Sequence, residues 1–188
     1  MDGIDGIGGI TGFLGFMLIA FYNNLSGMDP AYAYLSLALA FSCLGFLCFN
    51  TPRAKVFLGD VGSILLGFVF ACLIIALSEN IMDFFIMAGF LAPLYFDELF
   101  TMVVRIRSKD SLIEPHRKHI YQVLVNEACI PHWKISLGYG LIQLIIGLFV
   151  ISIKPKGLFF LLSAYLIFGL IFAVFSAFVR RKFPINEN

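Results

Sequence analysis

Residues 135–179 read ISLGYGLIQLIIGLFVISI, then KPK, then GLFFLLSAYLIFGLIFAVFSAFV, and this stretch decides the class of fold. Neither apolar run contains Lys, Arg, Asp or Glu, and each has about the 20 residues that one helical membrane crossing needs. The three residues between the runs, Lys154, Pro155 and Lys156, suit a tight polar turn. The stretch therefore predicts a transmembrane helical hairpin.

The rest of the chain has the same character. Its 188 residues are 60% hydrophobic and 13% charged, with a mean hydropathy of +0.93. Soluble domains have roughly 25% charged residues, so a soluble globular domain is excluded. The near-zero net charge gives no reason to expect nucleic acid as a partner.

Long apolar runs predict six membrane spans, at 7–25, 31–49, 62–78, 84–104, 135–153 and 157–179. We therefore expect an all-α fold, a polytopic transmembrane helical bundle of about six spans. Residues 1–188 would form a single integral membrane domain in the lipid bilayer.

The basic residues are distributed unevenly between the predicted loops. With the N-terminus in the cytoplasm, the far side of the membrane holds only Lys154 and Lys156 of the 13 Lys and Arg residues. Cytoplasmic loops are enriched in these residues, so we expect this orientation. It gathers three polar segments, 2–6, 50–63 and 105–134, on the cytoplasmic face.

The first polar segment, Asp2-Gly3-Ile4-Asp5-Gly6, opens the first span. A spacing of three places both carboxylates on one face of a helix. Helix starts also favour Asp, because unpaired amides and the helix dipole are positive there. A capped turn is therefore the alternative to a functional pair of acids.

The second polar segment, NTPRAKVFLGDVGS, runs from Asn50 to Ser63 into the third span. Gly59 and Gly62 permit close backbone approach, and the amides at a helix start can face phosphate oxygens. Asp60 can offer a carboxylate to a metal. The ending of a Walker A loop is missing. A helix cap made by Asp60 or Ser63 is the alternative.

The third polar segment contains the sequence EPHRKHIYQ in the long loop before the fifth span. His116, Arg117 and His119 supply hydrogen-bond donors and a planar cation that suit phosphate groups. A basic loop that only sets topology is one alternative. A zinc site completed by Cys129 and His132 is another, although the cations between the first two histidines would repel the metal.

Two acids, Asp97 and Glu98, lie within the fourth predicted span. Acids inside a membrane are costly and usually functional. Pro93, one turn earlier, is expected to kink the helix and open a polar pocket there. Helix–helix hydrogen bonding is the alternative. A small membrane transporter would use such acids for coupling, but most polar residues lie in loops rather than at the midplane.

Together, MDGIDGIGG, FNTPRAKVFLGDVGS and PHRKHIYQ closely resemble the polyprenyl-phosphate N-acetylhexosamine-1-phosphate transferase family, glycosyltransferase family 4. The resemblance spans the whole chain, and HRKHIYQ is similar to the O-antigen-initiating branch. It implies that UDP-N-acetylhexosamine and polyprenyl (undecaprenyl) phosphate give a polyprenyl-diphospho-sugar and UMP. The implied cofactor is Mg²⁺, with Mn²⁺ as a substitute, and the implied location is the cytoplasmic face of the bacterial inner membrane.

The resemblance also implies roles for single residues. Asp60 matches the magnesium ligand, and Asp2 matches a further active-site acid close to the metal. Six other residues match functional positions: Asp5, Asn50 and Phe57, which hold the uridine, and His116, Arg117 and His119, which close on the sugar and diphosphate.

Full-length relatives place several more spans and an Asp-Asp pair before the DGIDG motif, and that pair is proposed to engage the metal and the lipid phosphate. We therefore expect this chain to be the C-terminal part of the family's fold, with the N-terminal spans absent. We expect it to be inactive alone, and to have those spans or a second copy in a homodimer as partner. A non-catalytic fragment remains an alternative.

Overall fold

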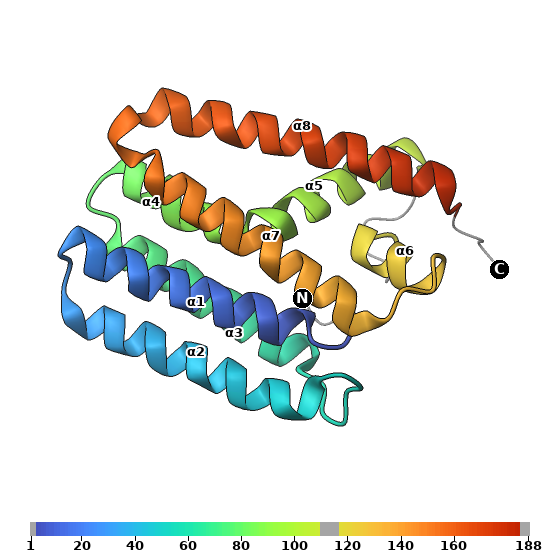
Figure 1. Cartoon of the computed structure of the whole chain (residues 1–188), viewed down its shortest axis with the longest axis horizontal. Helices are drawn as coiled ribbons and strands as arrows, with labels where there is room; N and C mark the ends of the chain where they lie inside the picture. The colour runs from blue at the N-terminus through green and yellow to red at the C-terminus, as the bar shows by residue number, and fades with distance from the viewer. Residues whose placement is uncertain (1–2, 110–116, 185–188) are drawn as a thin grey trace.

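The computed structural model describes residues 3–109 and 117–184, which form a helical bundle (Figure 1). No β-strand occurs in these two ranges. The helices are α1 (Ile7–Ser26), α2 (Pro30–Asn50), α3 (Gly59–Leu77), α4 (Ile81–Ala88), α5 (Ala92–Arg107), α6 (Ile120–Asn126), α7 (His132–Ser152) and α8 (Leu158–Lys182). Two 3₁₀ turns, η1 (Gly89–Leu91) and η2 (Lys154–Lys156), join α4 to α5 and α7 to α8.

Among the described residues, six helical segments are long and apolar enough to cross a membrane, which confirms the predicted all-α bundle of six spans. The fourth of them combines α4, η1 and α5. Two boundaries differ from the predicted ones in a way that concerns function. α3 begins at Gly59, so Asp60 lies inside a helix, and α8 continues to Lys182, so Arg180 does too.

The fourth span is broken where Pro93 predicts a kink. Pro93 lies in the first turn of α5 and has no N–H to donate to the turn before it, so the α-helical hydrogen bonding cannot continue through this point. The Tyr165 hydroxyl of α8 donates to the Phe85 carbonyl next to the break (2.7 Å). A Cβ at Gly89 would overlap the Tyr165 hydroxyl, so a larger residue there would displace Tyr165. The break therefore fixes how α8 packs on this span.

α1 lies at the centre of the bundle, between α2 and α7 (Figure 1). Glycines at both interfaces allow this close packing. A Cβ at Gly9 would lie 2.6 Å from Leu47 of α2, and one at Gly140 of α7 would lie 2.5 Å from Ile10. In their most apolar stretches, 67% of α1 is buried but only 17% of α2 and of α8. The outer helices therefore present apolar surface that suits lipid.

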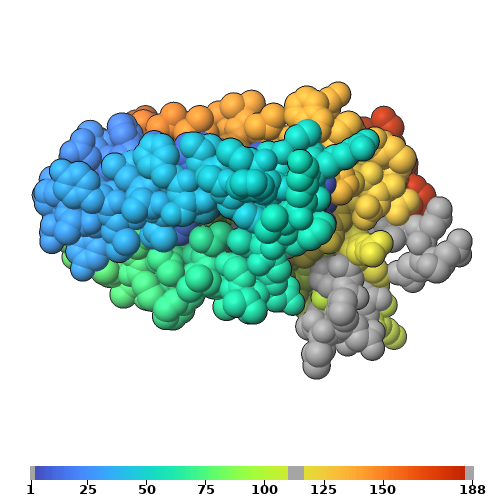
Figure 2. All heavy atoms as spheres, turned by 90° about the horizontal axis from the view of Figure 1, so that it is seen from below, coloured from blue at the N-terminus to red at the C-terminus, as the bar shows by residue number. Residues whose placement is uncertain are grey.

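The polar connections lie at one end of the bundle and the short turns at the other (Figure 1). The N-terminal residues, the α2–α3 connection, α6 and the end of α8 share the first end. In the space-filling view of Figure 2, the cyan α2–α3 connection and the yellow residues around α6 again lie close together. The described parts of the three polar segments that the sequence assigns to one membrane face thus meet at one end of the fold.

α6 forms within the segment that the sequence predicts as a loop. Its residues Ile120, Tyr121, Val123 and Val125 are buried. Ile120 and Val123 pack with Val179 of α8, while Tyr121 and Val125 pack in a second cluster around the N-terminal turn. These contacts, rather than a long amphipathic repeat, stabilise this seven-residue helix.

A buried carboxylate, Asp83, connects three elements at the opposite end. It accepts hydrogen bonds from the Tyr22 hydroxyl (2.5 Å) and the Asn80 amide (2.8 Å), and it pairs with Lys154 Nζ (3.0 Å). Burial lowers the pKa of Lys154, but hydrogen bonding to Tyr22 and Asp83 outweighs it and leaves that pKa above its ordinary value. The cluster fastens the α7–α8 turn to α1 and α4.

Candidate active site

The chain turns sharply at Gly6, immediately before α1. Its φ of +85° is costly for any residue with a Cβ. The Gly6 N–H donates to Asn50 Oδ1 at the end of α2 (2.6 Å), and Asn50 Nδ2 donates to the Val56 carbonyl (2.8 Å). Asn50 is only 1% exposed. Both ends of its amide therefore connect the DGIDG turn to the α2–α3 connection.

Asp5 lies in the same turn and contacts two other elements. Its carboxylate accepts a hydrogen bond from the Ala54 N–H (3.2 Å), and its carbonyl accepts one from the Ser136 hydroxyl of α7 (2.8 Å). The alternative that this segment merely caps the first span finds no support in Asp5, because Gly6 occupies the N-cap position and no side chain caps α1. Nor does Asp5 lie on a helical face. Its predicted companion Asp2 is outside the described residues.

His132, at the start of α7, faces the Asp5 turn. The Asp5 N–H donates to His132 Nδ1 (3.2 Å), so a neutral His132 carries its proton on Nε2. The same Nδ1 lies 3.4 Å from the Asp5 carboxylate, and a protonated ring would donate there instead. Sequence reasoning considered His132 only as a zinc ligand, whereas the structure places it next to a predicted binding residue.

A cavity of about 730 Å³ opens beside this turn. It is lined by Asp5, Cys48, Phe49, Thr51, Pro52, Arg53, Lys55, Pro131, His132 and Trp133. Its walls combine two exposed cations with a carboxylate and two aromatic rings, a mixture that suits a polar, anionic ligand. Of the described residues that the sequence predicted as site residues, Asp5 is the one that lines it.

Phe57 and Asp60 lie on the exposed part of the α2–α3 connection and the first turn of α3. The Phe57 ring is 69% exposed, and Gly59 has a φ of +65°. The alternative that Asp60 or Ser63 caps this helix is wrong: Leu58 is the N-cap residue and no side chain caps α3. The Ser63 hydroxyl donates to the Asp60 carbonyl (3.0 Å). The Asp60 carboxylate is exposed and has no hydrogen-bond or ion-pair partner among the described residues.

The third polar segment is described from Arg117 onward, and His116 lies outside the described residues. Arg117 is exposed. His119 is the N-cap residue of α6 and forms a capping box with Gln122. Its ring stacks on Tyr121, with the ring centres 5.1 Å apart and 4° between the planes. The capping box and the ring stacking therefore hold the described part of this segment in place.

Zinc binding by this segment finds no support in the described residues. His119 faces α5, whereas His132 faces the Asp5 turn. No group of three or more His, Cys, Asp or Glu side chains suitable for a metal occurs in residues 3–109 and 117–184.

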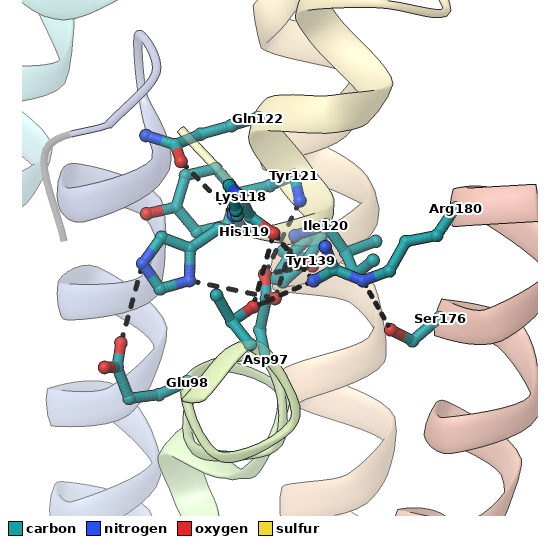
Figure 3. Close-up of polar contacts among 11 residues, drawn as sticks. Asp97, Glu98, Lys118, His119, Ile120, Tyr121, Gln122, Tyr139, Ser176 and Arg180 are labelled. Carbon is teal, nitrogen blue, oxygen red and sulfur yellow. Dashed lines mark hydrogen bonds and ion pairs between the residues drawn. The ribbon is translucent and has the colours of Figure 1, made fainter. Parts of the chain in front are cut away.

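Asp97 is the centre of a buried polar network beside His119 (Figure 3). Its carboxylate accepts hydrogen bonds from the Ile120 N–H (2.8 Å), the Tyr121 N–H (3.5 Å) and the Tyr139 hydroxyl (2.8 Å). The helix–helix hydrogen bonding named as one alternative is thus present. Glu98, by contrast, has a side chain that is 59% exposed, so the two acids do not share one buried pocket.

Arg180 of α8 completes the network from the other side (Figure 3). Its guanidinium donates to the Lys118 carbonyl (2.6 Å), the Thr101 hydroxyl (3.1 Å) and the Ser176 hydroxyl (3.3 Å). Sequence reasoning counted Arg180 only among the basic residues that set orientation. Long basic side chains near the end of a span commonly reach the membrane interface, so no sequence signal distinguishes Arg180 from Arg181 and Lys182.

The first and third polar segments also touch each other. A Cβ at Gly3 would lie 2.8 Å from Gln122 Nε2 and from the Tyr121 ring, so the DGIDG turn lies directly against α6. Ile4 and Ile7 belong to the same buried cluster as Tyr121. The structure therefore brings parts of all three predicted segments together around one turn.

Comparison with known proteins shows which family the sequence is related to. The family model described as glycosyl transferase family 4 matches residues 1–78. A probable undecaprenyl-phosphate N-acetylglucosaminyl 1-phosphate transferase of Bacillus subtilis is 30% identical over 166 residues, which cover 85% of this chain and 46% of the relative. The chain belongs to the polyprenyl-phosphate hexosamine-1-phosphate transferase family.

Other members of this transferase family match shorter stretches. An undecaprenyl-phosphate alpha-N-acetylglucosaminyl 1-phosphate transferase of Thermotoga maritima is 31% identical, over 68% of the chain and 46% of the relative. A phospho-N-acetylmuramoyl-pentapeptide-transferase of Staphylococcus saprophyticus is 34% identical, over 58% of the chain and 35% of the relative. No solved structure matches the chain at a comparable level.

The chain spans about half the length of the first two relatives, 46% in each case. Within this chain, the family model covers the first two polar segments. The Bacillus match covers 85% of the chain and therefore extends over the third segment as well. All three segments thus belong to the part of the chain that the transferase family shares.

Proposed function

We propose that this chain carries the nucleotide-, sugar- and metal-binding residues of a membrane glycosyl-1-phosphate transferase. The reaction transfers N-acetylhexosamine-1-phosphate from a UDP-sugar to polyprenyl phosphate and releases UMP. The product begins a lipid-linked cell-surface polysaccharide such as O-antigen. One observation carries the proposal: the Asp5 turn contacts both the α2–α3 connection and α6, so residues far apart in the sequence surround one site.

The chemistry of this reaction fits the polar end of the bundle. An anionic phosphate must approach an anionic diphosphate, so the site has to supply positive charge and hydrogen-bond donors. Arg117 is exposed, and His119 lies two residues later at the N-cap of α6. Phe57 presents an exposed ring that can stack on uracil, and Asp5 stands at the cavity wall.

The donor set also fits a magnesium ion. Proteins commonly hold Mg²⁺ through one or two carboxylates together with substrate phosphates and water. The exposed Asp60 carboxylate suits this mode, and Asp2 would be the second acid. When bound, Mg²⁺ or Mn²⁺ supplies charge neutralisation for the diphosphate. Asp60 and the arginine and histidine donors would then approach the diphosphate from different elements.

The location follows from the charge distribution. The basic residues other than Lys154 and Lys156 belong to the segments that meet at the polar end. Because positive charge favours the cytoplasmic side, this end faces the cytoplasm of a bacterial inner membrane in our proposal.

The test measures Mg²⁺-dependent UMP release. It uses membranes that contain this chain together with the N-terminal spans of a relative, and we expect the chain alone to be silent. Asp60→Asn keeps the shape of the side chain and removes its charge, so UMP release should fall to background while the protein remains inserted. Glu79→Gln, an equally exposed acid at the opposite end, should keep full activity. Normal turnover in Asp60→Asn would refute the assignment of Asp60.

A further inference from the structure

The backbone on both sides of His119 is held by side chains from two other helices. The Lys118 carbonyl, one residue before His119, accepts a hydrogen bond from Arg180 of α8 (2.6 Å). The Ile120 N–H, one residue after it, donates to Asp97 of α5 (2.8 Å). His119 therefore sits at the middle of a backbone segment whose two ends are fixed to separate spans.

The ring of His119 also lies between two carboxylates (Figure 3). Its Nδ1 is 3.8 Å from the Asp97 carboxylate and its Nε2 is 3.6 Å from that of Glu98. One face of the ring stacks on Tyr121, whose own N–H points at Asp97. Any movement of Asp97 would thus shift both the backbone and the surroundings of the ring.

Asp97 has donors on both carboxylate oxygens. The Ile120 N–H and the Thr101 hydroxyl reach Oδ1, while the Tyr121 N–H and the Tyr139 hydroxyl reach Oδ2. A carboxylate with this many donors is fixed in one orientation, and burial strengthens each of these bonds. The Asp97 carboxylate therefore fixes the positions of its four donors and has little hydrogen-bonding capacity left for a ligand.

Arg180 of α8 holds the residue before His119 from the side opposite to Asp97. It reaches Thr101 on α5 and Lys118 before α6 at the same time, so α8 fixes the distance between these two elements. Both contacts are made by one nitrogen, Nη2, while Nε donates to the Ser176 hydroxyl of the same helix and thereby holds the plane of the guanidinium. Lysine has neither the planar group nor a second donor for Ser176, so it would not hold its nitrogen at the position of Nη2.

We propose that Asp97 and Arg180 are positioning residues that set the imidazole of His119 for contact with the sugar diphosphate. The placement of His119 stands on geometry alone, and its chemical consequence rests on the proposed function. Because reacting groups need near-ideal alignment, a displacement of about 1 Å can cost on the order of 100-fold in rate. The two residues thus act through His119 without touching the substrate.

The first experiment follows the ring of His119 by NMR, with ¹⁵N-labelled histidine in the purified, lipid-embedded chain. The chain has three histidines, so single substitutions suffice to assign their signals. In Asp97→Asn, the new NH₂ group faces the Tyr121 N–H and the charge opposite Arg180 is lost. We expect the His119 signals to move or broaden in Asp97→Asn and in Arg180→Gln. The His132 signals should stay in place, because His132 faces the Asp5 turn.

Matched controls separate positioning from general damage. Arg181→Gln removes the adjacent, exposed arginine, and Asp83→Asn changes a buried acid at the opposite end, so both should leave the His119 signals unchanged. If Asp97→Asn disturbs the NMR signals of all three histidines, the variant has lost its fold. Arg180→Gln then provides the test of the proposal. Unchanged His119 signals in folded Arg180→Gln would overturn the proposal.

The second experiment measures UMP release by the same variants with the N-terminal spans of a relative supplied. Misplacement of His119 should lower kcat about 10- to 100-fold, with the KM for the UDP-sugar changed less than about threefold. Arg180→Lys should not restore kcat. A normal kcat in a variant with displaced His119 signals would overturn the catalytic part of the proposal. Absence of UMP release in the unmodified protein would count against the proposed function and leave the NMR result standing.

Discussion

Asp83 and Asp97 are both buried carboxylates with 1% exposure, at opposite ends of the same bundle. Asp83 contacts side chains: a tyrosine hydroxyl, an asparagine amide and the ammonium group of Lys154. Asp97 contacts two backbone amides of α6 as well as two hydroxyls. One acid joins helices to each other, whereas the other holds a short segment that carries a predicted site residue.

The difference shows what burial of a charge accomplishes at each end. Where connections are short, as at Asp83, the chain already fixes the geometry and the ion pair closes a turn. Near Asp97 the connection from α5 to α7 is long, and α6 has too few residues to be stable alone. There the Asp97 carboxylate stabilises the start of α6 by accepting its backbone N–H groups.

The first prediction concerns Asp83, at the end of the bundle opposite to Asp97. Asp83→Ala leaves the ammonium of Lys154 and the hydroxyl of Tyr22 without their acceptor. We expect a loss of about 3 kcal/mol in the free energy of unfolding, because the buried Tyr22 hydroxyl and the Asn80 amide lose their acceptor and an unsatisfied buried donor costs about 1–3 kcal/mol. Denaturant unfolding in detergent micelles measures it.

The control for this variant is at the same end. Asp29→Ala removes the exposed N-cap of α2, whose carboxylate accepts from the Ala31 N–H (2.9 Å), and should cost only about 1 kcal/mol. The kcat per folded molecule should be normal in both variants. A reduced kcat in Asp83→Ala would mean that the two ends are coupled.

The second prediction concerns an exposed ring at the polar end. Phe57→Ala should leave stability unchanged, since the ring is 69% exposed. If the ring stacks on uracil, its loss should weaken UDP-sugar binding by ~1–3 kcal/mol, which raises the KM roughly 5- to 150-fold. Steady-state kinetics measure this. Phe68→Ala, on the exposed side of α3, is the control, and a fall in kcat alone for Phe57→Ala would contradict stacking.

The fold was largely predictable because long apolar runs have one stable form in a bilayer. All six spans and the break near Pro93 follow from local sequence. α6 does not, since its amides bond to Asp97, more than 20 residues earlier in the chain. The side-chain caps considered as alternatives at the starts of α1 and α3 are absent, because Gly6 and Gly59, with positive φ, set how the chain enters the two helices.

The candidate site was predictable only in part. Motif resemblance selected Asn50, but no sequence pattern shows that both ends of its amide are occupied by Gly6 and Val56. Arg180 gave no motif at all, because its contacts with Lys118 and Thr101 join positions 62 and 79 residues away. Roles of this kind depend on which spans pack together, and apolar runs do not determine that. The placement of Asp2 and His116 stays a prediction.

The last prediction concerns Lys154, the ion-pair partner of Asp83. Lys154→Met keeps an apolar stem and removes the charge. The Lys154 side chain is 37% exposed, so water screens its ion pair, and we expect the substitution to cost less than about 1 kcal/mol. That is well below the effect of Asp83→Ala, because Asp83 retains the Tyr22 and Asn80 hydrogen bonds when Lys154 is lost.

The pH dependence of this small effect has a definite sign. The pKa of Lys154 is raised in the folded protein, chiefly because hydrogen bonds to Tyr22 and Asp83 outweigh burial. A raised lysine pKa contributes stability that is fully present below the unfolded value of about 10.4 and is lost as pH rises through the folded pKa. The stability difference between the unmodified protein and Lys154→Met should therefore stay constant from pH 6 to pH 9 and shrink at higher pH. A difference that grows above pH 10 would show that the ammonium group does not stabilise this end of the bundle.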